Sequence, residues 1–338
     1  MDLPDDDRRF LRRLLMTAGL GVFLLLLWAA REAILVSFAA VLIAILLDGA
    51  AGQLCARLGL GRKWALLAAG LLIIGAVVGA VALVGSQMAA QVAQLSQALP
   101  GALQGLEQRL GLRVPEEARS VSEGMLAQLA GLGRIVMDAL AAVALAVVGG
   151  AYLALEPERY RRGFVKLFPK ALTQEVEEVL ATLGRALRRW LLATLLAMAC
   201  VGVAAGLAAW ALGLPAPLAI GLFAGLMEVV PTLGAFIGAV PALLVAASQG
   251  GEALLWTAGA FLLIQQLESN LLSPLVGERL VDVPAFVLVV GVVAAGTVFG
   301  LPGVVLAAPI TVVALAVVQR LWVREALERR VEVTGERE

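Results

Sequence analysis

A carboxylate and a proline inside one long apolar stretch constrain this chain more than any other feature. The stretch covers residues 218–248 and contains Glu228 three residues before Pro231. An acid in the hydrocarbon of a bilayer costs about 2.5–3.5 kcal/mol on insertion scales, and a proline interrupts the hydrogen-bond ladder of a helix. A broken backbone at that depth is tolerated only where protein or a water-filled cavity surrounds it. The combination therefore indicates a polar site within a membrane.

The apolar residues are gathered into blocks of membrane-spanning length. Of the 338 residues, 61% are hydrophobic and 15% are charged, whereas soluble domains are closer to half apolar and a quarter charged. A spanning helix needs about 20 apolar residues. The blocks cover residues 14–30, 33–47, 64–85, 135–155, 190–212, 218–248, 253–267 and 284–319. We expect an all-α polytopic membrane protein with about eight transmembrane helices, a broken re-entrant helical hairpin and an extracytoplasmic helical insert.

The first two blocks are short and are separated only by Arg31 and Glu32, so we expect them to form a tight hairpin. No small-residue cleavage site follows the first block, which favours a retained span over a secretory signal. Cys55 and Cys200 are the only cysteines and do not suggest a disulfide framework.

The distribution of basic residues predicts the orientation. With the N-terminus in the cytoplasm, 21 of the 26 Lys and Arg residues fall in cytoplasmic segments, as the positive-inside rule requires. Both termini are then cytoplasmic.

The chain divides into five regions on this topology. We expect an N-terminal hairpin and third span, an extracytoplasmic insert, a fourth span with a cytoplasmic amphipathic helix, a C-terminal transport core and a cytoplasmic tail. The amphipathic helix begins near Thr173, and it could lie under its own subunit or contact another subunit. The regions are 1–85, 86–134, 135–189, 190–322 and 323–338.

Two broken hairpins are expected in the core, at 218–248 and 284–319. Glycines four residues apart in both blocks would let helices approach closely. Interrupted segments of this kind in two halves of a chain mark the binding sites of transporters. Whether the second hairpin crosses the membrane twice is left open. The expected helix breaks are at Pro231, Pro241, Pro274, Pro302 and Gly303.

Two groups of residues are candidates for a transport pathway. Around the first break, Glu228 and freed backbone groups could bind a proton, a cation or a polar solute. The alternative is a protonated glutamic acid that only joins two helices. At the end of the sixth span, polar side chains could line an inner vestibule, or could form a plain helix terminus with Glu268 paired to Arg279. The candidates are Glu228, Pro231, Thr232, Gly234, Gln265, Gln266, Glu268 and Asn270.

Three passages together resemble the autoinducer-2 exporter family of permeases. They are Glu228–Gly234 leading to Pro241, Gln265–Pro274 followed by Gly277–Leu280, and Gly300–Gly303 leading to Pro309. The chain departs from the family's pattern at two points. Thr232 stands where an aromatic residue is frequent, and Asp282-Val283 stand where a histidine is frequent before a proline.

The resemblance implies a bacterial or archaeal cell (inner) membrane protein that exports small polar molecules, or in some members exchanges cations for protons. It also implies a homo-oligomer, with a pentamer as one arrangement. The chain contains no histidine, so any proton relay must use carboxylates.

Other function classes find little support in the sequence. No zinc-protease, GxSxG or phosphate-loop motif is present, so we expect no enzyme, no metal site, no cofactor and no nucleic-acid partner. Three possibilities remain. They are a secondary transporter or exporter of small polar solutes such as autoinducer-like signals, a sodium (lithium)/proton antiporter using Glu228, and a non-transporting oligomeric scaffold in the lipid bilayer.

Overall fold

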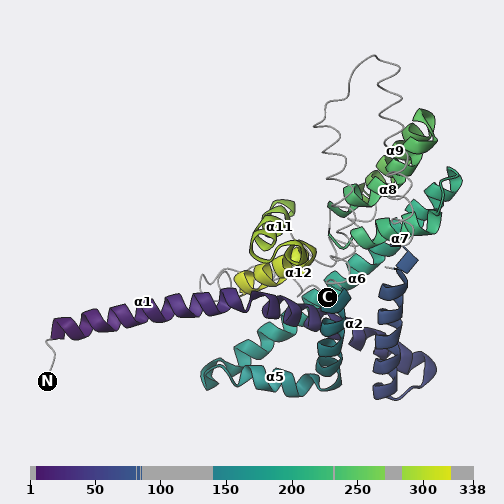
Figure 1. Ribbon diagram of the computed structural model, residues 1–338. Coiled ribbons are helices and arrows are strands. Elements are labelled where there is room, and N and C mark those ends of the chain that lie inside the picture. Colours follow the sequence, from purple (N-terminus) through teal and green to yellow (C-terminus); the bar gives the residue numbers. More distant parts are fainter. Residues whose placement is uncertain are drawn as a thin grey trace, which may run out of the picture.

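The computed structural model describes residues 5–80, 82–83, 85, 140–230, 233–270 and 284–320, with side chains from Leu14 onward except Ala285 (Figure 1). The expected all-α class is confirmed, because every regular element among these residues is a helix. The helices with labels are α1 (Asp5–Ala29), α2 (Arg31–Leu58), α5 (Pro157–Val165), η1 (Lys170–Leu172), α6 (Thr173–Ala211), α7 (Pro217–Met227), α8 (Leu233–Gln249), α9 (Gly251–Leu267), α11 (Ala285–Phe299) and α12 (Leu301–Val317).

Several of these helices are long and apolar enough to cross a membrane. Within the described residues they are Arg31–Leu58, Arg62–Ala80, Lys170–Ala211 and Leu301–Arg320. A further pair, Leu140–Leu155 and α5, passes the same test together but is bent by 89°. The chain is therefore a multi-pass membrane protein. The expected insert at 86–134 and the tail at 323–338 lie outside the described residues.

The expected tight hairpin at Arg31 is not formed. The Ala30 amide donates to the Leu26 carbonyl and the Ile34 amide donates to the Ala30 carbonyl, so the helical ladder continues through the junction. α1 consequently projects away from the remainder of the molecule (Figure 1). Two charged residues without a glycine or proline do not stop a helix, which explains why the expectation was wrong.

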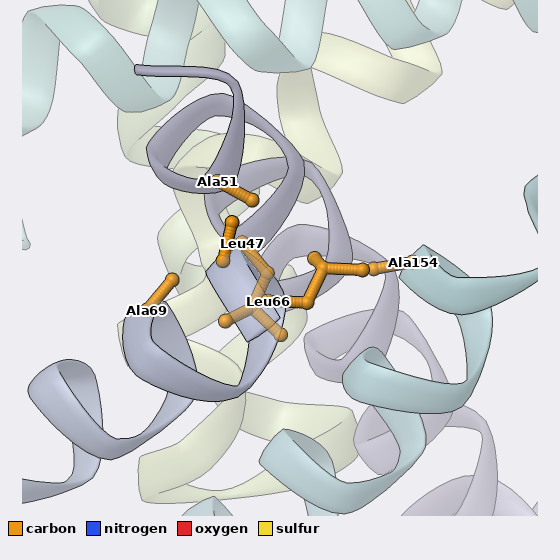
Figure 2. Close-up of a cluster of buried hydrophobic side chains, with 6 residues drawn as sticks. Leu47, Ala51, Leu66, Ala69 and Ala154 are labelled. Atoms are coloured by element: carbon orange, nitrogen blue, oxygen red, sulfur yellow. The ribbon is translucent and has the colours of Figure 1, made fainter. Parts of the chain in front are cut away.

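The N-terminal half has a small apolar core where α2 turns back into the helix Arg62–Ala80. Gly59 ends α2 in the left-handed region, with φ 64°, and its amide donates to the Cys55 carbonyl. The core side chains converge from α2, from Arg62–Ala80 and from the end of Leu140–Leu155 (Figure 2). They are Leu47, Ala51, Ala65, Leu66, Ala69 and Ala154.

α6 is the central helix of the C-terminal half and contacts α7, α9 and α12. The expected amphipathic helix and the fifth span form one continuous helix of 39 residues, so there is no interruption at residue 190. Thr173 is the first residue of α6 rather than its cap, and the cap position, Leu172, makes no side-chain hydrogen bond. Near the start of the apolar part, Ala186 and Trp190 pack against α12.

α7 reverses direction and lies against α6 with the two backbones in contact. A Cβ atom built on Gly221 would lie 2.5 Å from the Gly202 carbonyl oxygen and 2.8 Å from the Gly206 Cα. One turn further along, a Cβ on Gly225 would lie 2.6 Å from the Met198 carbonyl oxygen. Only glycine permits this separation, because any side chain would push the helices apart.

The second hairpin consists of α11 and α12, which lie side by side (Figure 1). The chain reverses at Gly300, with φ 68°, and Pro302 lies in the first turn of α12. Gly303 lies against the Ala295 carbonyl oxygen, where no side chain would fit. The break expected at Pro302 and Gly303 therefore falls at Gly300.

The expectation of a break at Pro241 is wrong, because α8 continues through it. Pro241 is buried inside α8, and tertiary packing can hold a helix across a proline when neighbouring groups satisfy the freed carbonyl. Pro274 lies outside the described residues.

Replacing Gly221 by alanine should destabilise the protein, whereas the same change at Gly259 should not. Gly259 lies on α9, and a Cβ atom added there would meet nothing within 4 Å, so alanine gains up to about 1 kcal/mol of helix propensity. At Gly221 the new methyl group meets backbone atoms and should cost about 1–3 kcal/mol. Thermal unfolding in detergent measures both variants. Equal midpoints for Gly221→Ala and Gly259→Ala would show that α6 and α7 do not touch.

Candidate functional site

The site is built on a helix that stops inside the bundle. α7 has 11 residues, about 16 Å of helix, which is roughly half of the 30 Å hydrocarbon core. Because α7 runs antiparallel to α6 and Gly225 lies beside Met198, Glu228 lies about one turn further along α6. That level is within the apolar part of α6, so the end of α7 lies at membrane depth.

The chain then makes a compact turn at this end. The amides of Glu228, Val229 and Val230 each donate to a carbonyl three residues earlier, at 3.1–3.3 Å, which tightens the last turn of the helix. α8 begins at Leu233 and packs back along α7. We call residues 228–230 the hairpin tip. Pro231 and Thr232, two of the expected site residues, lie outside the described residues.

Gly234 is required by the closeness of the returning helix. A Cβ atom there would collide with the Met227 carbonyl and would lie 2.8 Å from the Glu228 Cα. The Gly234 amide also donates to the Val230 carbonyl at 2.7 Å. Gly234 thus allows the two arms of the hairpin to meet directly behind Glu228, and its contribution is to position that carboxyl group.

The Glu228 side chain is 3% exposed and meets a second acid. Its carboxyl group lies close enough to that of Glu268 for the two to interact through charge and to share a hydrogen bond if one of them carries a proton. A hydrogen bond between two carboxyl groups needs a proton on one of them, and two adjacent buried carboxylates repel each other strongly. One proton on either group would therefore remove the repulsion and allow a hydrogen bond between them. We call Glu228 and Glu268 the acid pair.

Each member of the acid pair has one carboxyl oxygen that accepts no hydrogen bond from the described residues. Oε2 of Glu228 and Oε2 of Glu268 are buried without a hydrogen-bond partner among the described residues. Buried oxygens of this kind are costly unless a donor or cation satisfies them. The acid pair could therefore accept a polar solute or a small cation in addition to its proton.

Within the described residues, no hydrogen bond joins the other polar candidates at the end of α9 to Glu228. Gln266 and Asn270 are exposed, and the Asn270 Nδ2 donates to the backbone oxygen of Gln266 at 2.9 Å and to its Oε1 at 3.1 Å. Gln265 is half-buried and its carbonyl accepts from the Glu268 amide. Arg279, the partner considered for Glu268, lies outside the described residues.

Sequence reasoning named both acids but did not bring them together. α8 and α9 each have 17 residues and are joined through Gly250. Two antiparallel helices of equal length return the end of the second to the level of the start of the first. The similar lengths of the two apolar segments on either side of Gly250 were the signal that could have predicted the contact.

The described residues contain no group of three or more His, Cys, Asp or Glu side chains that could hold a metal ion. The acid pair offers two carboxyl groups, which suit a proton, a polar solute or a monovalent cation.

Comparison with known proteins identifies a family of membrane transporters. A family model described as "AI-2E family transporter" matches residues 18–322 of this chain. Two proteins of Bacillus subtilis are similar, "Putative transport protein YrrI" with 33% identity over 162 residues and "Putative transport protein YueF" with 30% over 166 residues. These matches cover 48% and 49% of this chain, and 46% and 45% of the relatives, so the similarity spans about half of each. "Putative transport protein MT0215" of Mycobacterium tuberculosis is 38% identical over 110 residues, 32% of this chain and 29% of that protein.

A cross-linking experiment tests the acid pair. Cys55 and Cys200 are first replaced by alanine, which leaves no native thiol. A short membrane-permeant bis-methanethiosulfonate should then link Glu228→Cys to Glu268→Cys, because the spacer replaces the two shortened side chains. Glu228→Cys with Glu252→Cys, at the other end of α9, is the matched control. Peptide mass spectrometry after proteolysis measures the product, and equal linkage in both pairs would contradict the contact.

Proposed function

This chain belongs to the AI-2E family of transporters, and from that premise we propose that it is a secondary transporter that exports small polar molecules. The observation that supports this proposal is the acid pair at the tip of a broken hairpin. A membrane-embedded carboxyl that faces a second carboxyl is costly for a scaffold and useful for a carrier. The third possibility, a scaffold without flux, leaves this arrangement without a purpose.

The acid pair can couple binding to movement. With one proton between them, Glu228 and Glu268 attract each other and hold the hairpin tip against the end of α9. When the proton leaves, two carboxylates about 4 Å apart repel by about 4 kcal/mol at an effective dielectric of 20. That is enough to favour a second arrangement in which the tip moves away from α9. Alternating access would follow from this movement of α7 and α8 against α6 and α9.

The solute is a small polar molecule, for which autoinducer-like signals are the class suggested by the family description. The unpaired oxygens of the acid pair accept hydrogen bonds, so a solute rich in hydroxyl groups matches them. We place the protein in the inner membrane with both termini in the cytoplasm, as the basic residues indicate. We also propose that it forms a homo-oligomer.

Sodium (lithium)/proton antiport is the second candidate, and the acid pair favours it specifically. Two carboxyl groups that hold either one proton or one monovalent cation bind the two ions in competition. Exchange would then need no further site. A solute carrier and an antiporter differ in whether ion flux continues when no organic solute is present.

Reconstituted vesicles test the proposal. The full chain is placed in liposomes that contain a pH-sensitive dye, and labelled autoinducer-2 is supplied with and without a proton gradient. Glu228→Gln and Glu268→Gln should each reduce gradient-driven flux by at least about tenfold, because a coupling of 1–3 kcal/mol is lost. Glu252→Gln, an exposed acid at the start of α9, is the control and should retain flux.

The same vesicles separate the candidates. Proton movement on addition of sodium or lithium without labelled solute would support antiport. Normal gradient-driven flux in Glu228→Gln would contradict coupling through the acid pair. An absence of all flux in correctly inserted wild-type protein would support the scaffold.

A further inference from the structure

A cavity with several charged lining residues lies away from the acid pair, where helices emerge from the apolar region. Its volume is about 460 Å³. Its polar wall comes from α2, the start of Arg62–Ala80, α5 and α6. The polar lining residues are Asp48, Arg62, Tyr160, Arg161 and Arg188.

The cavity lies at the level of a membrane surface. Asp48 directly follows the apolar run of α2, and Arg62 begins the next apolar helix. Next to it, the helix Leu140–Leu155 turns by 89° into α5, whose arginines and Tyr160 suit the headgroup region. On the orientation proposed above, this surface is cytoplasmic.

The three arginines are held differently. Arg62 belongs to the wall, because its Nη2 donates to Asp48 Oδ1 at 2.8 Å and to the Ala154 carbonyl at 3.4 Å. Arg161 is paired only with Glu158 on its own helix, at 3.0 Å and largely exposed, an interaction that stabilises little. Arg188 makes no side-chain hydrogen bond or ion pair with the described residues. Arg161 and Arg188 are therefore available for an anion.

The cavity wall is apolar beneath these charges. Val41, Ile45 and Leu153 line it and continue the apolar surface of the spanning helices. A guanidinium group matches the oxygens of a phosphate in a planar, two-pronged geometry. The apolar wall, the arginines above it and the ring of Tyr160 together match a phosphate that carries hydrocarbon chains.

We propose that this cavity binds the headgroup of an anionic phospholipid, with the phosphate between Arg161 and Arg188 and an acyl chain along α2. The lipid would join α5 to α2 and α6 at the point where the chain turns out of the membrane. The site is separate from the acid pair and does not depend on what the protein transports.

Binding to defined lipids tests the proposal. The purified full chain in detergent is titrated with phosphatidylglycerol or phosphatidylcholine, and native mass spectrometry counts bound lipid. Phosphatidylglycerol should bind at least about tenfold more tightly than phosphatidylcholine, since the rim supplies two unpaired or weakly paired cations. Arg161→Gln with Arg188→Gln should remove this preference.

The matched control removes the same two charges next to the cavity. Arg159 and Arg189 are the sequence neighbours on α5 and α6 and do not line the cavity, so Arg159→Gln with Arg189→Gln should keep the preference. Arg161→Lys with Arg188→Lys retains the charge but not the planar geometry, and should keep only part of it. This variant also serves if the glutamine variant does not fold.

Three results would overturn the proposal. Equal binding of both lipids by the wild type would show that no anionic headgroup is recognised. An equal loss of the phosphatidylglycerol preference in Arg159→Gln with Arg189→Gln would show that only general surface charge matters. Displacement of phosphatidylglycerol by millimolar inorganic phosphate alone would show that the site binds free phosphate instead of a lipid.

Discussion

The contact between the buried Glu228 and the half-buried Glu268 is the interaction on which the proposed function depends. Glu228 is placed at membrane depth by a helix too short to cross, and Glu268 is returned to it by the hairpin of α8 and α9. Neither placement is favourable alone, because a buried acid without a partner is costly. A proton between them would make the arrangement tolerable, and the proposed coupling rests on the loss of that proton.

α6 makes this arrangement possible by supporting both broken hairpins. Its apolar half carries α7 through glycine contacts that bring the backbones together. Its first half carries α12, through Ala186 and Trp190 and through Arg320, whose guanidinium donates to Thr182 Oγ1 at 2.8 Å and to Glu178. Both hairpins therefore pack on one continuous helix.

Much of this fold follows from sequence patterns. Apolar block length predicted helices, and Glu228 before a proline predicted a broken hairpin with an acid at its end. The sequence patterns did not predict where two expected elements form one continuous helix. Nothing local distinguishes an amphipathic helix followed by a span from the single helix α6. At Arg31, the lack of a glycine or proline was the local sign that the helix continues. It also did not predict which acid faces Glu228, because that contact joins residues 40 positions apart and depends on the equal lengths of α8 and α9.

Infrared spectroscopy of the carboxyl groups tests the central claim most directly. A protonated carboxyl absorbs apart from carboxylates, so one shared proton predicts a single protonated-acid band at neutral pH in the wild-type protein in lipid. If the proton is shared, the band should be lost or strongly shifted in both Glu228→Gln and Glu268→Gln, and unchanged in Glu252→Gln. A band that persists unshifted in either variant of the pair, or that never appears, would contradict the account.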